Sequence, residues 1–296
     1  MAITDAIVNF RRFLKRRNHS PHTVKNYLNR LKHFVVWLDV PLEEATHGKV
    51  LAYIDYLLDK RLKPSTINYH LLSVRRFYDY LAHEEGVPVS NPVKPGYALR
   101  LPRPLPRFLK EEDLAILLGA IRSLRDRAIF LLMLRSGLRV EEVAKLTLEA
   151  IDLKRDRLLV QQGKGGKDRV VYICPDTHLA LVEYLKRRPR TKAKQTFLVE
   201  KGLYTGKPLS VRGIQKRIEY YARKTGVTVS CHCLRHTMAT QLLNADAELA
   251  TIQDLLGHNW ITTTQRYCKV SNLKVKRDYY KAMEAVMHRT LPEQQS

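Results

Sequence analysis

Length, composition and charge narrow the classes of protein that this chain can belong to. It has 296 residues, with 52 Lys and Arg against 29 Asp and Glu, so its net charge is +23 and its pI is near 10.0. A chain of this length favours two domains, and its charge favours a polyanionic partner, nucleic acid first, over an acidic small molecule. The charge is not confined to a tail, because residues 1–107 carry +9 and residues 108–296 carry +14.

The apolar runs and cysteine spacing of the sequence indicate neither a targeting segment nor a disulfide framework. No apolar run approaches the ~18 residues of a membrane helix, and the N-terminus lacks the apolar stretch of a signal peptide. Among four cysteines, Cys231 and Cys233 flank a histidine, which is not typical of a disulfide scaffold. We therefore expect a cytoplasmic protein with reduced cysteines and no membrane contact.

The first 90 residues show helical patterns only. "SPHTVKNYLNRLKHFVVWL" begins with Ser20 as a predicted N-cap and Pro21 at the first helical position, and its apolar residues recur at helical spacing. "KPSTINYHLLSVRRFYDYLAHEEG" repeats this combination with Ser65 and Pro64. With "ITDAIVNFRRFLKRR" before them and "KVLAYIDYLLDKR" between, they predict a four-helix domain over residues 1–90, and its basic outer faces favour DNA binding.

Residues 91–107 are rich in proline, which cannot continue a helix and stiffens an extended connection. We expect a linker here. It carries the basic residues Lys94, Arg100, Arg103 and Arg107. It could follow a phosphate backbone, and a solvated linker explains the same residues equally well.

The remaining chain is mostly helical in pattern, with one interruption. "DRLLVQQGKGGKDRVVYIC" has apolar runs on either side of Gly163, Gly165 and Gly166, which predicts a β-hairpin with a glycine-rich turn. Helical patterns resume after it. We expect a mainly α fold, with a larger helical domain and a small antiparallel sheet over residues 108–271 and a C-terminal helix and tail over residues 272–296.

Histidine and arginine near the C-terminus could act on a phosphate. A phosphoryl group in its pentacoordinate state needs fixed positive charge, a nucleophile and a proton for the leaving oxygen. No acidic residues converge here, so a metal-independent site would rely on Arg and His. His232 and Arg235 are three apart at the predicted start of a helix, an end that favours anions. Alone, such a pair is more often a surface pair.

Three further positions gain meaning only in combination. Arg139 follows Ser136 and Gly137 at a predicted helix break, His258 follows Gly257 at a predicted helix end, and Tyr267 comes nine residues later. Taken singly, Arg139 would be interpreted as a solvated arginine and His258 as a structural histidine. Tyr267 would be only one of 15 tyrosines.

The motifs "SGLR", "GKGGKDR", "HCLRH", "LGH" and "TTTQRY" occur in the order and approximate spacing of one active-site series. In this the chain resembles the tyrosine site-specific recombinases and phage-type integrases. One short motif would be weak, whereas five in order are specific. The N-terminal helical region is similar to that of Xer-like and integron-like members, so the resemblance covers nearly the whole chain.

The resemblance implies a role for each matching residue. Arg139 and Arg235 would bind the non-bridging oxygens of the scissile phosphate, and His232 and His258 would complete the cradle, with His232 assisting proton removal from Tyr267. Tyr267 would attack the phosphate and leave a 3′-phosphotyrosyl link, so that strands exchange without ATP, metal or another cofactor.

Two supporting roles follow from the same resemblance. Lys164 on the hairpin turn would protonate the departing 5′-oxygen, although Lys167 lies in the same turn and only the family pattern selects between them. Glu142 would orient Arg139, with a surface glutamate as the alternative. Cys231 stands where the family often has proline. A zinc site of Cys231, His232 and Cys233 is disfavoured, because three such neighbours cannot easily aim at one ion.

The resemblance also implies partners. They are double-stranded DNA with inverted-repeat core sites, held in a clamp of the two domains, and further copies of the chain, as dimers and a tetramer linked by an exchanged C-terminal segment. Accessory proteins or a partner recombinase, and a location at the nucleoid, are part of this expectation. The alternatives are a type IB topoisomerase-like enzyme, a non-catalytic DNA-binding regulator and a metal-dependent nuclease.

Overall fold

The computed structural model describes residues 3–102, 107–161, 168–257, 264, 279–284 and 286. The chain divides into two compact units, Met1–Arg103 and Pro104–Ser296, and each is described by itself. In these described ranges, no helix combines the length and the apolar character that a bilayer crossing requires.

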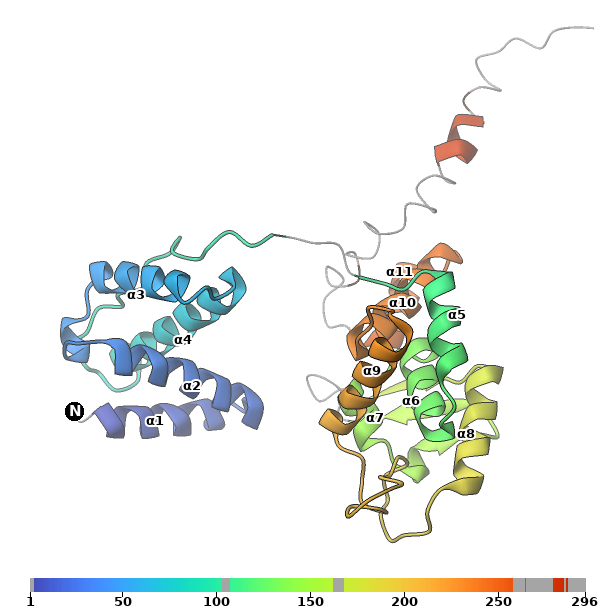
Figure 1. The fold of residues 1–296 in the computed structure, drawn as a ribbon. Coiled ribbons are helices and arrows are strands. Elements are labelled where there is room, and N and C mark those ends of the chain that lie inside the picture. Colours follow the sequence, from blue (N-terminus) through green and yellow to red (C-terminus); the bar gives the residue numbers. More distant parts are fainter. Residues whose placement is uncertain are drawn as a thin grey trace, which may run out of the picture. The chain divides into compact units, whose positions relative to one another are not determined.

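The first unit consists of helices packed around one apolar core (Figure 1). Its elements are α1 (Ile3–Arg16), α2 (Pro21–Trp37), the short 3₁₀ turn η1 (Leu42–Glu44), α3 (His47–Asp59) and α4 (Pro64–His83). The predicted four-helix domain is confirmed. Fully buried aromatic side chains from each α-helix meet in the core: Phe10, Phe34, Tyr53, Phe77 and Tyr78.

Capping at the helix starts agrees with the sequence pattern in one helix and not in the other. Ser20 caps α2 as predicted, since its Oγ accepts the backbone N–H of Thr23 at 3.1 Å. In α4 the N-cap residue is Lys63, whose side chain makes no capping hydrogen bond. The prediction that Ser65 caps this helix was therefore wrong. Pro64 occupies the first helical position, which leaves Ser65 already inside the first turn.

Part of the proline-rich stretch packs on the first unit. Val93 is buried in the core of that unit. The Nδ1 atom of His47 donates to the Pro92 carbonyl at 2.7 Å, and Asn68 exchanges two hydrogen bonds with the backbone of Leu99, at 2.9 and 2.7 Å. Residues 92–99 of the expected linker thus lie against α3 and α4, because apolar and polar anchors alternate with the prolines.

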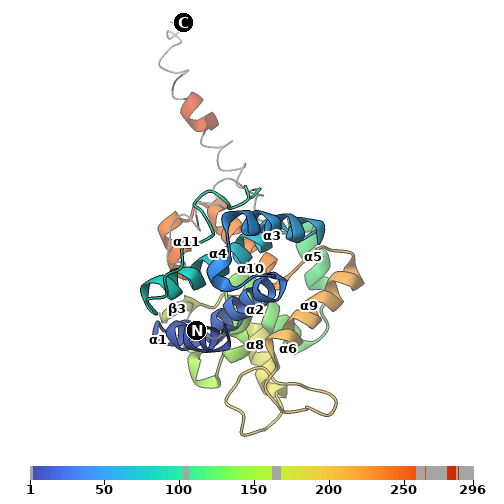
Figure 2. The ribbon, with the colours of Figure 1, turned by 90° about the vertical axis from the view of Figure 1, so that its left-hand side faces the viewer.

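The second unit surrounds a central helix, α6 (Leu124–Arg135), which is buried along most of its length and packs on α8 and α10 (Figure 1). Its other helices are α5 (Glu111–Ala120), α7 (Val140–Lys145), α8 (Pro175–Arg187), α9 (Val211–Thr225), α10 (Cys231–Asn244) and α11 (Leu249–Leu256). Residues 279–284 are helical as well. The connection from α8 to α9 projects beyond the helices in both views (Figures 1 and 2).

A small antiparallel sheet of order β1-β2-β3 lies within this unit. Its strands are β1 (Ile151–Asp152), which follows the 3₁₀ turn η2 (Leu148–Ala150), β2 (Arg157–Val160) and β3 (Arg169–Tyr172). In the register of β2 and β3, Leu158 lies opposite Val171 and Val160 lies opposite Arg169. The predicted hairpin is confirmed in its strands, while residues 162–167 of its turn lie outside the described residues.

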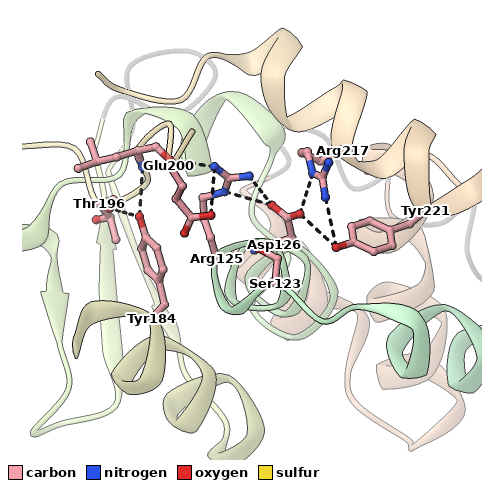
Figure 3. Close-up of polar contacts among 9 residues, drawn as sticks. Ser123, Arg125, Asp126, Tyr184, Thr196, Glu200, Arg217 and Tyr221 are labelled. Carbon is pink, nitrogen blue, oxygen red and sulfur yellow. Dashed lines mark hydrogen bonds and ion pairs between the residues drawn. The ribbon is translucent and has the colours of Figure 1, made fainter. Parts of the chain in front are cut away.

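A buried ionic network joins α6 to α9 (Figure 3). Asp126 has no exposed surface, and its carboxylate accepts from Arg125 Nη2 at 2.9 Å, from Arg217 Nε at 2.7 Å and from the Tyr221 hydroxyl at 3.2 Å. Arg125 also donates to the Leu198 carbonyl at 3.0 Å. A buried charge is stable only when it is paired and hydrogen-bonded, as it is here.

Candidate active site

Arg139 lies at a sharp junction between two helices. After α6 ends at Arg135, Gly137 takes a φ of 65°, and Arg139 becomes the N-cap residue of α7. A Cβ at Gly137 would lie 3.0 Å from Leu256 Cδ2 and 3.1 Å from Met238 Sδ. Glycine is needed both for this left-handed conformation and for the close approach to α10 and α11. The predicted helix break is confirmed.

Glu142 is bonded to Arg139 through both of its carboxylate oxygens. Oε1 accepts from Arg139 Nη1 at 2.8 Å, and Oε2 accepts from the backbone N–H of Arg139 at 2.7 Å. The glutamate therefore satisfies a free N–H at the start of α7 and contacts the guanidinium of the same residue. This is the contact that the expected orienting role of Glu142 requires.

Arg169, at the start of β3, makes a second contact with Glu142. Its Nη1 donates to Oε1 and its Nη2 donates to Oε2, each at 2.8 Å, and its Nε donates to the Leu255 carbonyl at 2.9 Å. The motif "GKGGKDR" contains this residue, but the sequence interpretation assigned it no role. One signal was present, because two-residue alternation places Arg169 on the same sheet face as the buried Val171.

The ionisation of Glu142 follows from these contacts. Burial alone would raise the pKa of this carboxyl, since the charged form loses its water. The hydrogen bonds and positive charge of Arg169, together with the backbone N–H and guanidinium of Arg139, outweigh burial and lower the pKa to about 2. Glu142 is therefore ionised at neutral pH.

The helix α10 carries the predicted pair His232 and Arg235. Ser230 caps the helix, because its Oγ accepts the backbone N–H of Cys233 at 3.2 Å. His232 is exposed in the first turn, and its ring meets that of His236 edge-on, with centroids 4.4 Å apart. Arg235 is only 1% exposed and donates to the carbonyls of Gly137 and Leu256. The predicted helix start at this pair is confirmed.

The carbonyls at the C-terminal end of α11 bind the guanidinium groups of three arginines. Gly257 ends this helix with a φ of 58°, as the sequence predicts. Three successive carbonyls accept from three arginines: Leu255 from Arg169, Leu256 from Arg235, and Gly257 from Arg139 at 3.1 Å. The last carbonyls of a helix lack partners within it and carry partial negative charge, so they attract cations.

The other predicted site residues lie outside the described residues: Lys164, Lys167, His258 and Tyr267. In the sequence, Lys164 and Lys167 fall in the turn between β2 and β3, and His258 follows Gly257 directly. Among the described candidates, the structure brings Arg139, Glu142 and Arg235 together at the end of α11, joined by Arg169.

The side chains of Cys231, His232 and Cys233 do not share one direction. Both cysteines are buried, whereas the histidine between them is exposed. Burial raises the pKa of Cys231 to about 11 and also raises that of Cys233, which keeps both thiols protonated. Within the described ranges, no three His, Cys, Asp or Glu side chains are grouped so that they could hold a metal ion.

Comparisons with known proteins match both units. Residues 107–273 match the model of the Phage integrase family, and residues 7–85 match that of the Phage integrase, N-terminal SAM-like domain. The tyrosine recombinase XerC of Halalkalibacterium halodurans is 35% identical over 281 residues, covering 90% of this chain and 92% of the relative.

Solved structures show the same fold. The crystal structure of XerA recombinase is 25% identical with a TM-score of 0.55, and the match covers 94% of this chain and 98% of XerA. A lambda integrase(75-356) dimer bound to a COC′ core site has a TM-score of 0.75 at 18% identity, with 90% of this chain and 95% of the integrase covered. The chain belongs to the phage integrase family and is a Xer-like tyrosine site-specific recombinase, an enzyme that cleaves and rejoins DNA.

Proposed function

We propose that Arg139 and Arg235 bind the non-bridging oxygens of the scissile phosphate, and that Tyr267 attacks its phosphorus. The observation that carries this proposal is the pair of adjacent carbonyls, of Leu256 and Gly257, that hold the two guanidinium groups. Adjacent residues have Cα atoms about 3.8 Å apart, so the two cations share one small region. Such a pair suits one phosphate group better than two separate ligands.

The charge of this region suits the transition state. A guanidinium presents a planar fork of donors and stays protonated, so it stabilises the added negative charge on the phosphate oxygens without losing a proton. The N-terminal end of α10, where His232 lies, contributes the positive end of a helix dipole. His232 and His258 complete this cradle.

The reaction is a transesterification. The Tyr267 oxygen forms a bond to phosphorus as the bond from phosphorus to the 5′-oxygen breaks. His232 assists removal of the phenolic proton, and Lys164 donates a proton to the departing oxygen. The product is a 3′-phosphotyrosyl link with a free 5′-hydroxyl. Attack by a 5′-hydroxyl of the partner duplex reverses the step and joins new strands without ATP.

The same proposal extends to assembly. Protomers bind an inverted-repeat core site in pairs, and two pairs form a tetramer around two duplexes, with accessory proteins or a partner recombinase where the biological task requires them. The lambda integrase relative was solved as a dimer on a core site, which supports the paired state. The exposed side chains of Tyr279, Tyr280 and Val286 suit transfer of the C-terminal segment to a neighbouring protomer. The assembled complex acts at the nucleoid.

One experiment tests the chemistry and also identifies the target sequence. The protein is incubated in EDTA with fragmented DNA from its source and denatured, and DNA covalently bound to protein is sequenced from its ends. Adducts at one inverted-repeat site that vanish in Tyr267→Phe support the proposal. Adducts scattered over the DNA favour a type IB topoisomerase-like enzyme instead, and adducts that persist in Tyr267→Phe overturn the assigned nucleophile.

A separate test concerns the general acid. Lys164→Ala should block cleavage of ordinary DNA but spare a substrate with a 5′-bridging sulfur, because a thiolate leaves without a proton. Lys167→Ala is the matched control from the same turn and should leave cleavage of ordinary DNA largely intact. Equal loss on both substrates in Lys164→Ala would contradict the role of this lysine.

A further inference from the structure

We propose that Arg169 is a positioning residue of the active site. Its positive charge compensates the carboxylate of Glu142, so that the positive charge of Arg139 remains available to the phosphate. This inference rests on the proposed role of Arg139. It also gives the hairpin a mechanical connection to the end of α11, because Arg169 begins the strand that follows the turn.

Glu142 is shared by two arginines. Oε1 accepts from the Nη1 atoms of Arg139 and Arg169, both at 2.8 Å, and Oε2 accepts from the Arg139 backbone at 2.7 Å and from Arg169 Nη2 at 2.8 Å. The contact with Arg169 is the bidentate fork that gives arginine–carboxylate pairs their strength and fixed geometry. Of these four hydrogen bonds to the carboxylate, Arg169 donates two and Arg139 donates two.

The charge of the cluster depends on this sharing. Arg139 and Glu142 alone would form a neutral pair, and a phosphate approaching Arg139 would also meet the carboxylate. With Arg169 the three groups carry a net charge of one positive unit. The side chains of Glu142 and Arg169 are only 8% and 11% exposed, so water screens these interactions weakly. The second arginine therefore raises the positive potential at the first.

The two arginines are not equivalent. Each of the three nitrogens in the Arg169 guanidinium already donates to the protein, to Leu255 or to Glu142. In Arg139 two nitrogens donate to the protein, Nη1 to Glu142 and Nη2 to the Gly257 carbonyl. The fork of Arg169 is committed to the carboxylate, so Arg169 acts through Glu142.

Close packing makes the connection rigid. A Cβ on Gly257 would lie 3.0 Å from Arg169 Cδ, so the arginine passes directly against the end of α11. Its Nε bond to Leu255 ties β3 to the helix that also holds Arg139 and Arg235. The strand β3 is therefore tied to the carbonyl of Leu255, directly before the two carbonyls that hold the predicted phosphate ligands Arg235 and Arg139.

The test is single-turnover cleavage of a nicked target duplex, which traps the covalent complex. Arg169→Met should slow cleavage by about 10- to 100-fold, because small displacements of a catalytic group are costly. DNA affinity should change little. The unfolding temperature should fall, because Glu142 loses one partner of a buried pair, but the variant should remain folded at the assay temperature. Arg169→Lys should recover part of the rate, since it restores the charge without the fork. Arg157→Met is the matched control, because Arg157 is the exposed first residue of β2 and pairs with the half-buried Asp152.

Coupling to Glu142 is measured by a double-mutant cycle. In a Glu142→Gln background, Arg169→Met should cost far less than in the wild type, because the neutral amide no longer needs a countercharge. An equal cost in both backgrounds would overturn the inference. Acidification gives a second readout. Loss of Arg169 raises the pKa of Glu142, so the ratio of variant to wild-type rate should rise as the pH falls.

The outcomes separate this inference from the proposed function. If Arg139→Met abolishes cleavage while Arg169→Met cleaves at the wild-type rate, only the positioning role is overturned. If Arg139→Met itself cleaves at the wild-type rate, the proposed phosphate ligand is wrong. The inference would also be overturned if the Arg169→Met protein is unfolded at the assay temperature and if neither Arg169→Lys nor acidification restores the cleavage rate. Such a result would show a purely structural role for Arg169.

Discussion

Asp126 is the acidic side chain on which the contact between α6 and α9 depends. Its carboxylate is fully buried and bonded to Arg125 and Arg217 (Figure 3). Asp126→Asn removes the negative charge and leaves two guanidinium groups facing a neutral amide. We expect the free energy of unfolding to fall by about 3 kcal/mol, as for other buried pairs that lose one partner.

Denaturant unfolding, followed by circular dichroism, checks this prediction. The control is Glu112→Gln, which also neutralises an acid in the first turn of a helix of the same unit, but at an exposed position. The control should change stability by less than about 0.5 kcal/mol. Equal effects of the two substitutions would show that the network stabilises nothing beyond a surface charge.

His70 makes the stability of the first unit dependent on pH. Burial, followed by the charges of His33 and Arg30, lowers the pKa of His70 from 6.5 to about 4. The unfolded chain therefore gains a proton at a higher pH than the folded one. Stability contributed by neutral His70 is complete above about pH 6.5 and is lost as the pH falls toward 4, by up to about 3 kcal/mol.

The measurement is the free energy of unfolding at pH 7 and at pH 4.5 for the wild type and for His70→Asn. Asparagine keeps a polar atom near the Tyr53 hydroxyl, which lies 2.9 Å from His70 Nδ1, but it does not titrate. The decrease between the two pH values should be clearly smaller in the variant. Identical decreases would mean that other groups cause the acid sensitivity.

At this scale the sequence predicts those residues whose partners are close in the chain. Glu142, which the resemblance places beside Arg139, bonds to that arginine from three positions away, and its orienting role stays a prediction. The pairing of Arg169 with Glu142 spans 27 residues, and that of Asp126 with Arg217 spans 91. Such partners are set by how helices and strands pack. Neither periodicity nor a motif contains that information, although the inward position of Arg169 on β3 was a usable signal.

At the scale of the elements, the two helix-ending glycines of the second unit offer a matched comparison. Gly226 ends α9 with a φ of 73° and Gly257 ends α11 with a φ of 58°. An added Cβ meets nothing within 4 Å at Gly226, but it lies 3.0 Å from Arg169 at Gly257. Gly226→Ala should therefore cost only backbone strain, about 1 kcal/mol.

Gly257→Ala should cost more, because Arg169 must move as well, and it should also slow DNA cleavage. Thermal unfolding and single-turnover cleavage of both variants check the prediction. Gly226→Ala should cleave at the wild-type rate. A result in which both variants lose the same stability and the same activity would argue against the close contact between Gly257 and Arg169.

Helices and strands were largely predictable, because their periods of 3.6 and 2 are local properties of the chain. The four N-terminal helices and the hairpin strands followed from apolar spacing and glycine positions. Local cues failed where a tertiary contact decided the outcome. Residues 92–99 contain prolines typical of a linker, yet Val93 and Leu99 find partners on the first unit.

At the scale of the whole molecule, the basic charge on both sides of the linker predicts a steep salt dependence of DNA binding. Each phosphate that a protein neutralises lowers log K by about 0.9 per log unit of salt, so 6–10 contacts cost roughly 10³–10⁵ in affinity between about 50 and 200 mM. A titration of the wild type against salt measures this slope. A flat response would contradict contacts from both basic regions.

The way in which the three arginines are held at the end of α11 determines which sequence changes the enzyme tolerates. Its three arginine-binding groups are main-chain carbonyls, which every amino acid supplies, so substitutions at Leu255 or Leu256 can keep the oxygens that hold Arg169 and Arg235. An inserted or deleted residue in α11 is different. It rotates the helix end by about 100° and shifts it by about 1.5 Å, which displaces the acceptors of all three arginines at once. The candidate active site is therefore sensitive to the length of this helix more than to its composition.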